Sequence, residues 1–94
     1  MSKQTIEWKR LVDRLWSAAD LDYAQGARLV AEIAGSEEPA LQRAAAQALP
    51  SLRGACLKGA DRAARARARR RLSAVRDILH ALDAPRFGRR VRPG

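Results

Sequence analysis

The apolar residues of this chain recur every three or four positions, the spacing of one helix face, and no stretch shows the sustained alternation of a strand. The first stripe consists of Trp8, Leu11, Val12, Leu15, Trp16 and Ala19. It predicts a helix over about 5–18, with Thr5 as the N-cap that accepts a hydrogen bond from the first turn. We expect both tryptophans to pack in the core. The alternative role for them is an interface anchor.

A second stripe predicts a helix over about 21–34. Its inward residues would be Tyr23, Ala27, Val30, Ile33 and Ala34. Asp20 precedes this segment as a capping residue, and Gly35 follows it, where a left-handed residue commonly ends a helix.

The third helix has a well-marked start, because Ser36 can cap it and Pro39 falls in the first turn, where a missing N–H costs no hydrogen bond. Its apolar face carries Leu41, Ala45, Ala48 and Leu52. Pro50 predicts a kink or a break near Ala46, since the proline ring clashes with the carbonyl four residues earlier. A short piece over 50–58 follows, with Cys56 as a small core residue, and Gly59 ends it.

Asp61 is expected to cap the last and longest helix, over about 62–82. Its apolar stripe is Ala64, Ala68, Leu72, Val75, Leu79 and Leu82. The segment 84–94 contains four arginines, two prolines, two glycines and no acid, which is typical of a flexible basic arm. The sequence therefore predicts an all-α fold: one small bundle of four helices over 1–83, the third kinked or broken at Pro50, and a basic C-terminal arm over 84–94.

Charge is divided unevenly between the halves of the 94-residue chain, whose formal net charge is +9. Residues 1–50 hold six Lys and Arg against seven Asp and Glu, a net of −1, whereas residues 51–94 hold thirteen against three, a net of +10. Such asymmetry indicates a polyanionic or acidic partner.

A helical projection groups part of this charge into a ridge beside the apolar stripe of the last helix, roughly 21 Å long. The ridge consists of Arg62, Arg65, Arg69, Arg76 and His80, and the length given is that from Arg62 to Arg76. Arg70, on the far side, is a further candidate for binding, whereas Arg67 and Arg71 fall on the other flank. Guanidinium groups suit phosphate oxygens because they donate in a planar fork. The alternative is that these arginines form a solvated face with no partner.

The arm is expected to extend this surface. It supplies Arg86, Arg89, Arg90 and Arg92, with Phe87 available to stack on a base. Binding through these groups should weaken steeply with salt, because each neutralised phosphate releases counterions.

Catalysis has few candidates, since Cys56 and His80 are single copies and no His, Cys and Asp cluster has metal-site spacing. We expect a protein that is not an enzyme and needs no metal or cofactor. One cysteine allows no internal disulfide, and neither a secretory signal nor an apolar run of membrane-spanning length is visible. These features predict a cytoplasmic protein that does not use a membrane.

The stretch 27–49 resembles a helix-turn-helix: Ala31 takes the tight packing position, Gly35 the turn, and Leu41 the apolar seat of a second helix. The resemblance implies that Gln42 and Arg43 face base edges. Glu37 and Glu38 depart from the pattern, because they would face phosphates.

Two functions fit these features. The first is a small regulatory or accessory protein that binds DNA or RNA through the Arg-rich last helix and arm. The second is a protein-binding inhibitor or adaptor, similar in size to antitoxins, anti-activators or anti-CRISPR inhibitors, whose basic face docks on an acidic surface of a larger complex. A homodimer is compatible with either.

Overall fold

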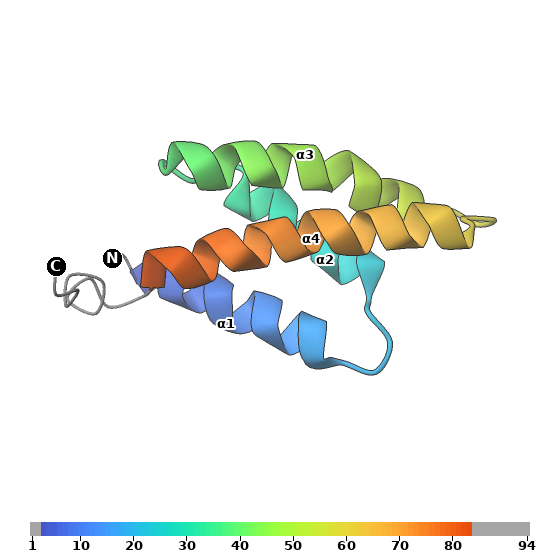
Figure 1. Ribbon diagram of the computed structural model, residues 1–94, viewed down its shortest axis with the longest axis horizontal. Coiled ribbons are helices and arrows are strands. Elements are labelled where there is room, and N and C mark those ends of the chain that lie inside the picture. Colours follow the sequence, from blue (N-terminus) through green and yellow to red (C-terminus); the bar gives the residue numbers. More distant parts are fainter. Residues whose placement is uncertain (1–2, 84–94) are drawn as a thin grey trace, which may run out of the picture.

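The computed structural model in Figure 1 describes residues 3–83. These residues form four helices: α1 (Lys3–Ser17), α2 (Tyr23–Ile33), α3 (Pro39–Cys56) and α4 (Arg62–Asp83). Each helix packs against its neighbour in the chain, and α4 closes the arrangement by packing against α1 as well as α3. The predicted all-α bundle of four helices is confirmed.

The core lies where the four apolar stripes meet. From α4 it takes Ala68, Leu72, Val75 and Leu79, all with no exposed surface, as the stripe predicts. From α1 it takes Trp8, Val12 and Leu15. The expectation for Ala19 is wrong, because α1 ends at Ser17 and Ala19 is exposed in the following loop. Each fully buried leucine contributes roughly 1.5–3 kcal/mol, so this stripe anchors α4 and fixes which of its faces meets solvent.

Of the four predicted N-caps, those at Thr5, Asp20 and Ser36 are wrong, and the one at Asp61 is confirmed. Helix α1 already includes Lys3, which places Thr5 inside the helix. Helix α2 is capped by Asp22, not Asp20, because the Asp22 side chain accepts a hydrogen bond from the Gln25 amide at 3.0 Å. Asp61 does cap α4, accepting from the Ala64 amide at 2.8 Å.

The end of α2 differs from the expectation for Gly35. Among the described residues, the positive φ belongs to Gly59, at 88°, and not to Gly35. Helix α2 instead ends in bonds of three-residue span, from the Gly35 amide to the Glu32 carbonyl and from the Ser36 amide to the Ile33 carbonyl. Such bonds satisfy the last carbonyls without a left-handed residue.

Helix α3 runs without a break through Pro50. Both Pro50 and Ala46 are exposed. The proline ring and the carbonyl that has lost its amide partner therefore face solvent, where water can satisfy that carbonyl. Pro39 is the first helical residue, as expected. The predicted cap at Ser36 is wrong, because the N-cap is Glu38 and its side chain makes no capping hydrogen bond. The Ser36 hydroxyl instead accepts from the Glu38 amide at 3.0 Å, just before the helix.

The segment that resembles a helix-turn-helix does not keep that motif's packing. Leu41 is fully buried, as an apolar seat should be. Ala31, however, is exposed, so it does not occupy the tight contact between the two helices. Glu37 and Glu38 are both exposed at the start of α3, where their charges would repel phosphates.

Candidate nucleic-acid interface

The N-terminal half of α4 exposes a dense group of arginines. Residues 62–71 contain six arginines and no acid. All six are exposed, and the side chains of four of them have no hydrogen bond or ion pair within residues 3–83; these unpaired arginines are Arg62, Arg65, Arg67 and Arg70. Their charge is therefore not neutralised by the acids of the N-terminal half.

Arg71 lies on the side of α4 that faces α3. Its guanidinium donates a hydrogen bond to the side-chain carbonyl oxygen of Gln47 at 3.1 Å. Because an amide carries no net charge, this bond orients Arg71 without neutralising it.

Arg69 lies on the opposite side, which faces α1. Its guanidinium carbon lies 4.9 Å from the centre of the Trp16 ring, and that of Arg76 lies 5.8 Å from the same ring. Both distances are within the range of cation–π attraction. The partly buried Trp16 therefore orients Arg69 and also leaves its charge in place.

Further along α4, an acid from α1 binds two members of the predicted ridge. The Asp13 carboxylate accepts from Arg76 Nε at 3.1 Å and from His80 Nε2 at 2.8 Å. Lys9 Nζ lies 3.8 Å from the other carboxylate oxygen. Partial burial alone would raise the pKa of Asp13, but the hydrogen bonds and charges of His80 and Arg76 outweigh it and lower the pKa.

The predicted ridge is therefore divided. Arg62 and Arg65 are unpaired, and Arg69 rests on a tryptophan, while Arg76 and His80 face an acid of α1. Figure 1 shows why, since α1 (blue) lies along the C-terminal part of α4 (red and orange) and not along its N-terminal part. The predicted Arg86, Phe87, Arg89, Arg90 and Arg92 lie outside the described residues.

Sequence reasoning missed four contributors to this region. It left Arg67 and Arg71 out of the candidate site, and it assigned no role to Gln47 or Asp13. The helical projection could have found the first two, because it places them on a second flank of the same helix. The role of Asp13 depends on the packing of α1 against α4, which residue spacing within one helix does not reveal.

Cys56 is exposed, which corrects the expectation that it packs in the core. The buried face of α3 continues from Leu52 to Ala55, which is 5% exposed, and the helical rotation turns the next residue outward.

Across residues 3–83, no three His, Cys, Asp or Glu side chains come together as a metal-binding group. No helix in this part combines the length and hydrophobicity needed to cross a membrane.

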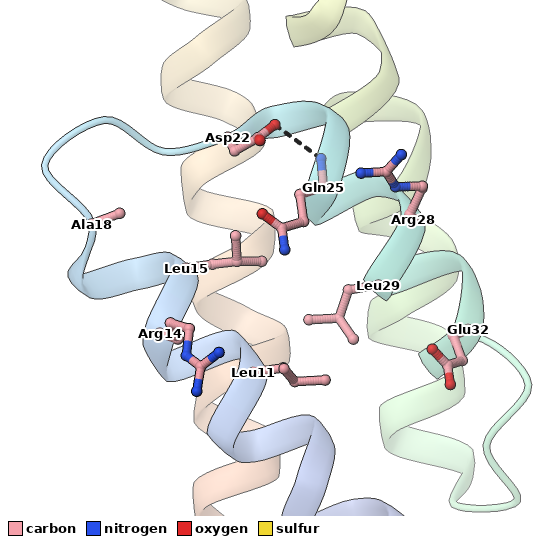
Figure 2. A pocket seen from close by; sticks show the side chains of 9 residues that line it. All are labelled: Leu11, Arg14, Leu15, Ala18, Asp22, Gln25, Arg28, Leu29 and Glu32. Carbon is pink, nitrogen blue, oxygen red and sulfur yellow. Dashed lines mark hydrogen bonds between the residues drawn. The ribbon is translucent and has the colours of Figure 1, made fainter.

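A separate cavity of about 360 Å³ lies between α1 and α2, away from the basic half of α4. Figure 2 shows Leu11 and Leu15 from α1 converging with Leu29 from α2. Its polar lining consists of Arg14, Asp22, Gln25, Arg28 and Glu32. The volume is at the lower end of the range for small-molecule sites.

Comparisons with protein-family models, curated proteins and solved structures give no match to this chain.

Proposed function

We propose that this protein binds nucleic acid through the N-terminal half of α4. One observation supports the proposal most directly. The unpaired arginines lie on one exposed stretch of helix, and no acid follows the cap Asp61 within that stretch; they are Arg62, Arg65, Arg67 and Arg70. They span roughly 12 Å of helix, enough to meet two or more phosphates of a backbone at once.

The repulsion within this stretch supports the same function. Arg65 and Arg69 are four residues apart, as are Arg67 and Arg71, and like charges at that spacing destabilise a helix by about 0.2–0.5 kcal/mol per pair. A face that served only solubility would mix the two signs. The contacts to Trp16 and Gln47 hold two of these arginines in place without cancelling their charge.

The proposal is tested by replacing the unpaired arginines with glutamine and measuring the affinity for a labelled DNA duplex by fluorescence anisotropy. The matched control removes the same charge elsewhere, from Arg10, Arg14, Arg28 and Arg43, all exposed on the other helices. The wild type should show a salt slope of about −3 to −4 in log K against log salt concentration. The α4 variant should lose most of that slope, and the control variant should keep most of it.

Two results would overturn the proposal. One is the absence of binding by the wild type to both DNA and RNA duplexes at low salt. The other is equal weakening in the two glutamine variants, which would show that net charge acts without regard to position.

The second candidate is a protein-binding inhibitor or adaptor. Trp and Arg are enriched in protein–protein hot spots, and Trp16 is a partly exposed tryptophan in contact with Arg69 and Arg76. Under this alternative the same arginines dock on an acidic surface. Recovery of one stoichiometric protein partner after nuclease treatment, from a protein that ignores purified nucleic acid, favours it.

A further inference from the structure

We infer that the N-terminal half of α4 enters the major groove of B-form DNA, with Arg70 directed at base edges and arginines on both flanks contacting the two backbones. This inference rests on the proposed nucleic-acid binding and adds the type of nucleic acid, the groove and a base-contacting residue.

Two contacts fix the flanks of α4 independently of any helical projection. Arg69 rests on Trp16 of α1, and Arg71 donates to Gln47 of α3. Since α1 and α3 lie on different sides of α4 (Figure 1), these two arginines leave the helix on different sides. Because successive residues are about 100° apart around the helix, Arg62 lies on the same side as Arg69, and Arg67 lies on the same side as Arg71. The two pairs lie roughly on opposite sides of the helix.

Arg70 lies about midway between the flanks, on the side of α4 that faces away from the core. Its nearest neighbours on this outward side are small: Ala63 and Ala74 are exposed, and Ala66 and Ser73 are half-buried. The exposed Asp77 lies two turns further on, outside the N-terminal half of α4. The opposite side is fixed by the fully buried Ala68 and Leu72. The outward side is therefore narrow, and Arg70 is its one long side chain with hydrogen-bond donors. The opposite side of the helix is held in place by the core.

The dimensions match the major groove of B-DNA, which is about 12 Å wide and 8.5 Å deep and admits one α-helix. A helix with ordinary side chains is about 10–12 Å across, and alanines let this one approach closely. Arginines on opposite flanks then reach phosphates of opposite strands. Arg70, at the bottom of the groove, is suited to donate two hydrogen bonds to guanine O6 and N7, the commonest specific contact of arginine.

The surroundings leave this part of α4 accessible. Helix α1 accompanies the C-terminal part of α4 and not its N-terminal part (Figure 1), and Arg62 and Arg65 are exposed there. Helix α3, by contrast, begins with the exposed Glu37 and Glu38. Repulsion between these acids and phosphates favours α4 over α3 as the helix that meets DNA.

A comparison of DNA and RNA duplexes distinguishes insertion of α4 into the major groove from electrostatic attraction to the phosphate backbone alone. The major groove of A-form RNA is deep and too narrow for side chains to read. We expect the wild type to bind a DNA duplex at least about tenfold more tightly than an RNA duplex of the same sequence and length at the same salt concentration. Equal affinities would overturn groove insertion and leave the proposed function standing.

The role of Arg70 is tested against Arg67, a flank residue that is also exposed and carries the same charge. On randomised duplexes, Arg70→Ala should abolish a guanine preference at one position of the selected site, and it should remove the protection of guanine N7 from dimethyl sulfate. Arg67→Ala should weaken binding to all sequences alike and keep the preference.

The side chains of Arg67 and Arg70 are both exposed and unpaired in the described part of the chain. The melting temperatures of the two alanine variants should therefore match that of the wild type. Indistinguishable effects of the two substitutions would show that α4 lies outside the groove. Failure of the wild type to bind either duplex would overturn the proposed function itself.

Discussion

The carboxylate of Asp13 lies 3.1 Å from Nε of Arg76, so an acid from the balanced half of the chain neutralises an arginine of the basic half. The same oxygen lies 2.8 Å from Nε2 of His80. This contact joins α1 to α4 across 63 residues of sequence and divides the basic surface into a paired and an unpaired part. Asp13 therefore both stabilises the bundle and limits how far the basic surface extends along α4.

Replacing this acid should have two opposite effects. Asp13→Asn keeps an acceptor but removes the charge, so we expect the free energy of unfolding to fall by about 0.5–1 kcal/mol, as for partly exposed ion pairs. Because Arg76 and His80 then no longer face a negative charge, affinity for a DNA duplex should rise by about two- to fivefold. Urea unfolding and anisotropy measure the two effects.

Glu32→Gln is the matched control for this experiment, because it removes one exposed acid at the cavity between α1 and α2. It should leave stability nearly unchanged and raise affinity less than Asp13→Asn does. An equal gain in affinity from both variants would show that net charge alone is responsible.

The lowered pKa of Asp13 predicts a dependence of stability on acidity. The folded pKa lies below the usual value of 3.8, since His80 and Arg76 favour the ionised carboxylate. Both folded and unfolded chains are ionised at Asp13 well above pH 3.8, so the contribution to stability is fully present there. It is lost as the pH falls through 3.8 and then through the lower folded pKa.

Urea unfolding of the wild type and of Asp13→Asn between about pH 2 and 6 measures this contribution as a difference, which removes the effects of the other acids. The difference should shrink toward zero at the acid end. A difference that stays constant over the whole range would contradict the assigned hydrogen bonds.

The sequence allowed the four helices and most of the buried stripes to be predicted, because the periodic burial of apolar residues is a property of each helix alone. The errors arose where contacts between neighbouring helices determine the cap or the buried residue. Asp20 and Asp22 are equally good caps in isolation, and only the path of the loop selects Asp22. Leu29 is buried in α2 although the predicted stripe omitted it, because α2 faces both α1 and α3.

The candidate site could be predicted in part for the same reason. The crowding of arginines over 62–71 is visible in the sequence, and the structure shows four of them exposed and unpaired within residues 3–83. The division of the ridge by Asp13 could not be predicted, since it requires knowing that α1 packs along the C-terminal part of α4.

Gly26 offers a stabilising substitution inside α2. Glycine in a helix costs about 0.5–1 kcal/mol relative to alanine. A Cβ added at Gly26 would lie 3.5 Å from the nearest atom, Cδ2 of Leu52, which is an ordinary van der Waals contact. Gly26→Ala should therefore raise the free energy of unfolding by about 0.5–1 kcal/mol in thermal or urea unfolding.

Gly59 provides the opposite case, because its φ of 88° is unfavourable for any side chain. Gly59→Ala should lower stability by about 1 kcal/mol although its Cβ would meet open space. If both substitutions changed stability in the same direction, the backbone assigned to one of these glycines would be wrong.

The position of Cys56 provides a direct chemical test of the end of α3. Its thiol is exposed in the folded chain, so a thiol reagent such as dithionitrobenzoate should react with the native protein at nearly the rate seen in urea. The matched variant moves the thiol by one residue, with Cys56→Ser combined with Ala55→Cys. Ala55 is 5% exposed, so the relocated thiol should react only when the helix end opens, more slowly by an order of magnitude or more. Slow reaction at Cys56 and fast reaction at position 55 would mean that the last turn of α3 is rotated, and with it the approach of the chain to Asp61 and the direction of the first arginines of α4.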